Sequence, residues 1–208
     1  MPKVKVKICG ITQPEDAVLA SEAGADAIGL NFYNKSPRAI DIDIACHIVD
    51  SLPPFITKVG LFVDASHDYI QSILSEVNLD VIQFHGGENE DDCMRYGLPY
   101  IKAIRMRKGM KLTEVITHYS KSSAILVDTY ISGTPGGTGK SFDWNLIDEH
   151  ISKPLILAGG LTPENVSDAI RSVKPYAVDV SGGVEKSPGI KDRDKMLKFI
   201  QKARELTI

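Results

Sequence analysis

The sequence predicts an α/β protein that folds as a single (βα)8 barrel, the TIM-barrel architecture, over residues 1–208. Short apolar runs alternate with amphipathic stretches along the whole chain, and there are about eight of these runs, the number that closes a parallel barrel. Each run is almost continuously hydrophobic, which is typical of parallel strands covered on both faces. The runs are KVKIC, DAIGLNF, TKVGLFV, VIQFH, YIKAI, AILVD, PLILAG and AVDVS.

The amphipathic stretches between these runs carry helix start and stop signals. We expect a first helix after TQPED, with Thr12 as the N-cap, Pro14 in the first turn and Gly24 as the stop. The stretch LTPENVSDAIRSV opens in the same way at Thr162. The last stretch, DRDKMLKFIQKARELTI, has apolar residues at helical spacing and should close the barrel wall.

A doubly wound open sheet is the competing architecture. Such a sheet carries its glycine-rich phosphate loop after the first strand, whereas the glycine-rich loops of this chain occur late. The count of eight strands also favours the barrel. No linker, low-complexity tract or change of composition divides the chain, and a length of 208 residues requires short loops.

The composition excludes several functional classes. A formal net charge of -3 gives no sign of a nucleic-acid-binding or membrane-binding surface, and no apolar run is long enough to span a bilayer. The N-terminus lacks the apolar segment of a signal peptide. Cys9, Cys46 and Cys93 form no close pair, so we expect a reducing, cytoplasmic environment. Cys46 and Cys93 fall in helical stretches, where cysteine usually packs as a small hydrophobe.

Two strand ends carry groups that can move protons. Cys9 ends the first strand, and Asp128 ends the run AILVD. In a parallel barrel these ends meet at one rim, where the active site lies. A cysteine in a strand is more often a core residue, and a buried aspartate can be held by purely structural hydrogen bonds. On a shared rim, however, the thiol and the carboxyl could act as base and acid.

The last two strands both end in small residues. Gly159 and Gly160 follow the seventh strand, and Ser181, Gly182 and Gly183 follow the eighth. Barrels of this type often hold a phosphate between these two loops, because glycines let backbone N–H groups approach an anion closely. Tight turns are the alternative interpretation. Two such loops in the expected order favour a phosphate site.

Further polar residues follow other strands. Arg38 could bind a carboxylate through its two-pronged guanidinium group, or it could simply lie on the surface. Gln83 and His85 stand at the tip of the fourth strand, where the histidine can hydrogen-bond a substrate or merely pack. We expect both, together with Asp179 in the eighth strand, to contact substrate. No spacing of histidines or carboxylates predicts a metal site.

The segment GTPGGTGKS, residues 133–141, is close to a nucleotide-binding P-loop. That pattern needs a glycine where Thr134 stands, and no matching magnesium-binding acid is evident. We interpret the segment instead as a mobile loop beside the active site, because Gly136, Gly137 and Gly139 allow hinge motion.

Together these motifs resemble the phosphoribosylanthranilate isomerase family. The matching blocks occur in the family's order and cover almost the whole chain. They are KICGIT, GLNFYNKSPR, VGLFVD, VIQFHGGE, LVDT, GGTGKSFDW, LAGGLTPENV and DVSGGVE followed by GIKD. The resemblance implies a cofactor-free enzyme of tryptophan biosynthesis that converts N-(5'-phosphoribosyl)anthranilate to 1-(2-carboxyphenylamino)-1-deoxyribulose 5-phosphate by an Amadori rearrangement.

The resemblance also implies roles for individual residues. Cys9 matches the family's general base, Asp128 its general acid, and Arg38 the arginine that holds the anthranilate carboxylate. The glycines after the last two strands match the phosphate cradle. The family usually reads DVSSGVE, and Gly182 replaces the second serine here. This removes a hydroxyl near the phosphate but keeps the backbone N–H groups, so we expect at most a modest loss of affinity.

Two other interpretations stay open. The chain could be another phosphosugar barrel, of the ribulose-phosphate epimerase or indoleglycerol-phosphate synthase type. The indoleglycerol-phosphate synthase type uses a lysine as acid, and Lys102 lies in a strand where such a lysine could sit. Alternatively, the chain could be a barrel that binds phosphate and only scaffolds partners. In every case we expect a small phosphosugar ligand, no metal, and a monomer or homodimer.

Overall fold

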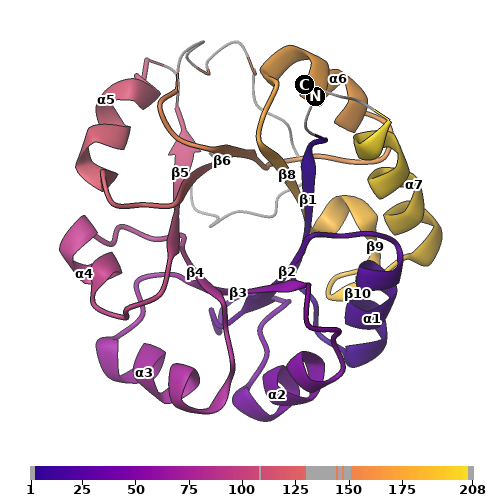
Figure 1. Ribbon diagram of the computed structural model, residues 1–208, viewed down its shortest axis with the longest axis horizontal. Helices are drawn as coiled ribbons and strands as arrows, with labels where there is room; N and C mark the ends of the chain where they lie inside the picture. Colours follow the sequence, from indigo (N-terminus) through magenta and orange to yellow (C-terminus); the bar gives the residue numbers. More distant parts are fainter. Residues whose placement is uncertain (1–2, 108, 130–143, 145–146, 148–150, 206–208) are drawn as a thin grey trace.

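The computed structural model describes residues 3–107, 109–129, 144, 147 and 151–205. Its strands form a closed barrel in which neighbouring strands follow one another in sequence order and the last pairs with the first. All these pairings are parallel, and Figure 1 shows the helices as an outer ring around the strands. The (βα)8 barrel is therefore confirmed, and the doubly wound sheet is excluded.

Each of the eight predicted runs corresponds to one strand of the barrel, and β5 and β6 extend past the ends of their runs. The strands are β1 (Lys5–Cys9), β2 (Ala27–Asn31), β3 (Thr57–Phe62), β4 (Val81–Phe84), β5 (Tyr100–Met106), β6 (Ala124–Thr129), β7 (Leu155–Leu157) and β8 (Ala177–Val180).

The described helices follow the strands in order. They are α1 (Pro14–Glu22), α2 (Ile42–Asp50), α3 (His67–Glu76), α4 (Glu90–Met94), α5 (Leu112–Ile116), α6 (Val166–Val173) and α7 (Arg193–Arg204), with the 3-10 turns η1 (Thr117–Tyr119) and η3 (Gly182–Val184). A small antiparallel hairpin, β9 (Glu185–Ser187) and β10 (Ile190–Lys191), follows η3. The segment 133–141, which we expected to be a mobile loop, lies outside the described residues.

The start of α1 differs from the prediction. Gln13 is the N-cap residue, and it makes no side-chain capping bond. The hydroxyl of Thr12 instead donates to the carbonyl of Gly189, in the hairpin between β9 and β10, at 2.5 Å. A tertiary partner has therefore taken the hydroxyl that we expected to cap the helix. The predicted stop is consistent with the structure, because Gly24 adopts a φ of 95° directly after the last turn.

The start of α6 also differs. The helix begins at Val166, with Asn165 in the N-cap position, and not near Thr162. The intervening residues form a turn, in which the Glu164 N–H donates to the Thr162 hydroxyl and the Thr162 N–H donates to the side chain of Asn165. The residues that we expected to start the helix thus form the turn at the end of the loop after β7.

The barrel has an outer and an inner core, because side chains alternate between its two faces along each strand. The larger core lies between strands and helices. The smaller core fills the barrel interior with Val59, Ile101, Ala103, Ala124, Leu126, Ile156, Ala158 and Ala177. Polar side chains continue the inward-facing rows toward the carboxyl-terminal ends of the strands, which places them at one rim.

The cysteines outside the rim lie in helices, as expected. Cys93 in α4 is buried, Cys46 in α2 is half-buried, and both are free thiols. Within the ranges given above, no helix combines the length and the apolar character needed to cross a membrane.

Candidate active site

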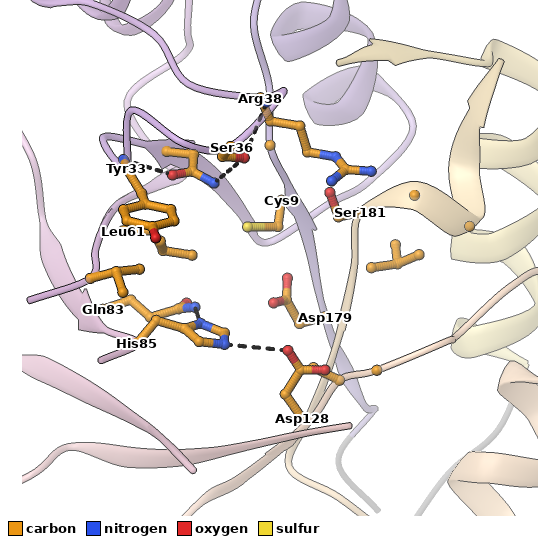
Figure 2. Close-up of a pocket in the computed structure, with 18 of the residues that line it drawn as sticks. Cys9, Tyr33, Ser36, Arg38, Leu61, Gln83, His85, Asp128, Asp179 and Ser181 are labelled. Carbon is orange, nitrogen blue, oxygen red and sulfur yellow. Dashed lines mark hydrogen bonds and ion pairs between the residues drawn. The ribbon is translucent and has the colours of Figure 1, made fainter. Parts of the chain in front are cut away.

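A cavity of about 590 Å³ opens at the carboxyl-terminal ends of the barrel strands. Figure 2 shows side chains from several strands directed into it. The structure brings together every site residue that the sequence analysis singled out, although these residues come from nearly the whole length of the chain. The cavity is lined by Cys9, Arg38, Gln83, His85, Asp128, Gly159, Gly160, Asp179, Ser181, Gly182 and Gly183.

Cys9 is the last residue of β1, and its side chain belongs to a buried charged group. Lys7 lies two residues earlier on the same inward-facing row, and it pairs in register with Asp179 of β8. The Lys7 ammonium donates to Asp179 Oδ1 at 3.0 Å. Burial raises the pKa of the Cys9 thiol, the charge of Lys7 opposes this rise, and the charge of Asp179 adds to it. The protonated thiol is therefore the resting form.

Asp128 lies next to His85 in the cavity (Figure 2). His85 Nε2 lies 3.3 Å from Asp128 Oδ2, and His85 Nδ1 lies 3.1 Å from the amide nitrogen of Gln83. The amide nitrogen of Gln83 is a donor and faces Nδ1, which leaves Nε2 as the ring nitrogen that faces Asp128. This arrangement holds the carboxyl group in place and can stabilise its negative charge after it has given up a proton.

The loop after β2 is folded by its own side chains into a shape that presents Arg38. The Asn31 side chain accepts from the Tyr33 N–H at 2.9 Å and donates to the Ser36 hydroxyl at 3.0 Å. The same hydroxyl accepts from the Arg38 N–H at 3.1 Å. The run NFYNKSPR thereby forms a compact turn at the rim.

The guanidinium group of Arg38 is held by an acid that the sequence analysis did not single out. Arg38 Nε and Nη2 donate to the two carboxylate oxygens of Glu185, each at 2.8 Å. Burial favours the neutral acid, but the bonds from Arg38 and Lys191 outweigh this effect and lower the pKa of Glu185. Glu185 therefore occupies one edge of the guanidinium group, and among the described residues no hydrogen bond engages Nη1, which can bind a ligand.

Lys191 connects three parts of the rim. Its ammonium group donates to the Cys9 carbonyl at 2.6 Å, to the Ser181 carbonyl at 3.3 Å and to Glu185 at 2.8 Å. Burial lowers the pKa of Lys191, and the carboxylate of Glu185 opposes that shift. The hairpin of β9 and β10 thus fixes the ends of β1 and β8 relative to each other.

The two glycine-rich loops pack tightly together. Gly159 and Gly160 have φ values of 87° and 66°, a region that favours glycine. A Cβ at Gly183 would lie 1.9 Å from the Leu161 carbonyl, so only glycine lets the second loop approach the first this closely. Asn165 supports the first loop by donating to the Gly160 carbonyl at 2.9 Å.

Lys102, the lysine that another phosphosugar barrel could use as its acid, does not line the cavity. It lies on the outward-facing row of β5, where its ammonium group donates to Glu88 at 2.7 Å and to the Gly86 carbonyl at 2.8 Å. It also lies 5.4 Å from the centre of the Tyr119 ring. This placement removes the observation that favoured an indoleglycerol-phosphate synthase-like reaction.

The cavity contains polar atoms that a ligand could engage. In the described part of the chain, the amide oxygen of Gln83 and the hydroxyl of Ser181 are buried without a hydrogen-bond partner. Buried polar groups are normally paired, so these two favour a ligand rich in hydroxyl or phosphate groups. Over the same residues, no three histidine, cysteine, aspartate or glutamate side chains are grouped closely enough to hold a metal ion.

The sequence analysis missed Lys7, Glu185 and Lys191. A signal for Lys7 was present, because a lysine in the middle of a strand buried on both faces needs a charged partner. Glu185 and Lys191 stand in the blocks DVSGGVE and GIKD, but neither has a spacing that points to Arg38.

The comparisons with known proteins agree on one family. Residues 6–202 match the family model described as N-(5'phosphoribosyl)anthranilate (PRA) isomerase. The chain belongs to this family. The N-(5'-phosphoribosyl)anthranilate isomerases of Pseudomonas fluorescens and Pseudomonas aeruginosa are 56% and 55% identical to it over 204 residues, which cover 98% of this chain and 97% of each relative.

Solved structures of the phosphoribosylanthranilate isomerase family superpose closely. The protein from Thermotoga maritima has 40% identity and a TM-score of 0.85, with 98% of this chain and 100% of that chain covered. A structure of such an isomerase in complex with reduced 1-(o-carboxyphenylamino)-1-deoxyribulose 5-phosphate has 39% identity and a TM-score of 0.82, with the same coverage.

Proposed function

We propose that this chain converts N-(5'-phosphoribosyl)anthranilate to 1-(2-carboxyphenylamino)-1-deoxyribulose 5-phosphate, the isomerisation after which its family is named, as a step of tryptophan biosynthesis. One observation carries the proposal: a single cavity holds a thiol, a carboxyl group, an arginine and two glycine-rich loops. The substrate has one matching part for each of these groups, namely a C2 proton, a ring oxygen, a carboxylate and a phosphate.

The two ends of the substrate set its orientation. The phosphate lies between the loops after β7 and β8, where Gly159, Gly160, Ser181, Gly182 and Gly183 offer backbone N–H groups and a hydroxyl. The anthranilate carboxylate binds the open edge of the Arg38 guanidinium group. The ribose then spans the cavity between Cys9 and Asp128.

The reaction begins at the ring oxygen. Asp128 in its protonated form donates a proton to this oxygen, the C1–O bond breaks, and the nitrogen lone pair forms a protonated Schiff base with C1. Cys9 as thiolate removes the C2 proton, and the electrons of the C2–H bond neutralise the iminium nitrogen. The resulting enolamine takes a proton at C1 and loses one from its C2 hydroxyl, which yields the ketone. Acid and base suffice for every step.

The neighbouring residues support these steps. The imidazole of His85 orients the Asp128 carboxyl group, and Gln83 holds that imidazole in place. The free amide oxygen of Gln83 accepts a sugar hydroxyl. Asp179 lines the cavity near Cys9, where it can contact the C2 end of the substrate.

All the residues of this mechanism come from one chain, so a monomer or a homodimer would serve equally. The reaction requires Cys9 to stay reduced. We therefore place the protein in a reducing compartment such as the cytoplasm.

The test is fluorescence-detected turnover of freshly prepared phosphoribosylanthranilate by the wild type, Cys9→Ser and Asp128→Asn, with Cys46→Ser as a control thiol outside the cavity. We expect both site variants to lose turnover while they still bind the reduced product analogue. A wild type that binds the analogue but does not turn over would instead favour a phosphate-binding scaffold or another phosphosugar reaction. If the two site variants kept their turnover, other residues would have to carry out the acid and base steps.

A further inference from the structure

Lys7 is a buried charge that the mechanism above does not use directly. It lies in the middle of β1 and is 4% exposed. Burying a lysine ammonium costs free energy unless a partner compensates it, and an apolar residue at such a position is often at least as stabilising as a buried ion pair. A purely structural role therefore explains this lysine poorly.

The geometry directs Lys7 toward Cys9. Both side chains face the barrel interior over Gly29 of β2, which has no side chain of its own. A Cβ built on Gly29 would lie 2.6 Å from the Cys9 sulfur and 3.1 Å from the Lys7 nitrogen. The sulfur and the ammonium group therefore approach the same point. Lys7 donates one of its three N–H groups to Asp179 Oδ1, which leaves two N–H groups that can point toward the sulfur.

The other charged groups around Cys9 are engaged elsewhere. Lys191 donates to the backbone carbonyl of Cys9 and to Glu185. Arg38 forms its two-pronged pair with Glu185. Asp128 and His85 line the same cavity and face each other. Within the described part of the chain, Lys7 is the cation whose ammonium group lies beside the sulfur, and Asp179 is its counterion.

We propose that Lys7 is a positioning residue for the base of this reaction: its ammonium group holds the deprotonated sulfur of Cys9 during removal of the C2 proton, and Asp179 keeps that ammonium group charged and directed into the barrel. The inference rests on the proposed function, because it assigns a role within the same reaction. Lys7 itself neither gives nor takes a proton. The sulfur gains the proton from C2, and the Lys7–Asp179 pair keeps its charge throughout.

The two partners should act on the sulfur with opposite signs. Without Lys7, the thiolate loses its cation and faces Asp179 alone, so the thiolate fraction falls. Without Asp179, Lys7 can pair fully with the sulfur, so the thiolate fraction rises. A pair that only supports the fold predicts neither change, because it would affect stability alone.

The first experiment measures the rate of Cys9 alkylation by iodoacetamide against pH, followed by mass spectrometry of the Cys9 peptide in the intact protein. We expect Lys7→Met to slow alkylation at pH 8 about 10-fold or more, since each pKa unit changes the thiolate fraction tenfold. Asp179→Asn should accelerate it. The control is Lys5→Met, which removes a lysine from the same strand at the opposite end of the barrel, where Lys5 pairs with Asp26. This variant should alkylate like the wild type.

A double variant covers the case in which Lys7→Met does not fold because it leaves Asp179 buried and unpaired. Lys7→Met with Asp179→Asn removes both charges, and circular dichroism verifies its fold. Because the Lys7 ammonium group approaches the sulfur over Gly29 and can donate to it, alkylation of the double variant should remain slower than that of the wild type. A folded Lys7→Met or double variant with the wild-type alkylation profile would overturn the proposal.

Steady-state kinetics separate this inference from the proposed function. We expect Lys7→Met to lower kcat about 10-fold or more with KM nearly unchanged, and to move the acid limb of kcat/KM to higher pH. A wild type without turnover that still shows the alkylation pattern would refute the proposed function and leave the Lys7–Cys9 relationship standing. A wild type with turnover, together with a Lys7→Met variant of unchanged kcat and pH profile, would refute the role of Lys7 alone.

Discussion

Arg38 and Glu185 form a two-pronged ion pair at the rim of the barrel, with both N···O distances at 2.8 Å. The pair joins the loop after β2 to the hairpin after β8. Because Glu185 also accepts from Lys191, it is fixed before any ligand arrives. The arginine that we assign to the substrate carboxylate is thus held in one orientation in advance, which lowers the entropy cost of binding.

Replacement of Glu185 tests this arrangement. We expect Glu185→Gln to raise KM about 10-fold with a smaller effect on kcat, because the lost charge-assisted hydrogen bonds release the guanidinium group. The measurement is steady-state kinetics with the substrate. Glu164→Gln is the control, because Glu164 forms an exposed pair with Lys198 outside the cavity. Equal KM values in wild type and Glu185→Gln would contradict the orienting role.

Gly29 should be sensitive to the smallest possible side chain. A Cβ there would lie 2.6 Å from the Cys9 sulfur, too close for the present position of the sulfur to persist. We expect Gly29→Ala to lower kcat by about 100-fold, since a displacement on the order of 1 Å at a reacting group can cost that much. Gly87→Ala is the control, because its Cβ would meet only Asp64 at an ordinary 3.6 Å. A Gly29→Ala variant of wild-type kcat would show that the sulfur tolerates relocation.

Gly182→Ser introduces the serine that the resemblance described in the sequence analysis implies at this position. Its Cβ would lie 3.1 Å from Arg38 Nη2, which Glu185 holds in place, while its hydroxyl could reach the phosphate. We expect tighter binding of ribose 5-phosphate and weaker binding of anthranilate, each by about 3-fold or less, which is a fraction of one hydrogen bond. Calorimetric titration with the two fragments measures this difference. Gly182→Ala separates the effects, because it adds the Cβ alone and should weaken only anthranilate binding.

The buried thiol of Cys93 should make the fold sensitive to alkali. Burial raises the pKa of Cys93 from 9.0 to about 12, with the charge of Lys102 partly opposing the shift. A raised pKa in the folded state stabilises the fold below the unfolded value, and this share is lost as the pH rises through the folded value. The free energy of unfolding should therefore fall between pH 9 and pH 12, by up to about 1.4 kcal/mol per pH unit from this group.

Denaturant unfolding at several pH values between 8 and 11 measures that slope. Cys93→Ala should lower stability at every pH through lost packing, yet show a shallower decline above pH 9 than the wild type. Cys46→Ala is the comparison variant: the pKa of this half-buried thiol is also raised, but of the two thiols the shift is large only at Cys93, so Cys46→Ala should change the slope less. Parallel curves for wild type and Cys93→Ala would show that the thiol does not contribute to the pH dependence.

The rim residues were predictable because, in a parallel barrel, the carboxyl-terminal ends of all strands lie at the same rim in sequence order. Once eight apolar runs were recognised, the end of each run identified a place on one rim, which brought Cys9 and Asp128 into the same cavity. Strand parity would also have put Lys7 on the inward-facing row with Cys9, although the sequence analysis missed it. Its partner Asp179 was not predictable in that role, because the pairing depends on the register with which β8 closes onto β1.

The hairpin after β8 accounts for most of what the sequence could not predict. Nothing in its composition indicates that Glu185 reaches Arg38, that Lys191 reaches the Cys9 carbonyl, or that Gly189 accepts from Thr12. These contacts join residues that lie far apart in the chain. They form only when the barrel is closed. A residue such as Thr12, which the local sequence predicts as an N-cap, then makes a tertiary hydrogen bond instead.

The seam between β1 and β8 makes ring closure itself a condition for activity. The register of Lys7 with Asp179 and the bonds of Lys191 all cross this seam, so the base and its charged neighbours assemble only when the two ends of the barrel meet. Turnover therefore measures the fraction of molecules in which the barrel is closed. If the chain were divided anywhere between β1 and β8, neither fragment alone would turn over substrate. Recombination of the two fragments would restore turnover, which could be measured without background activity.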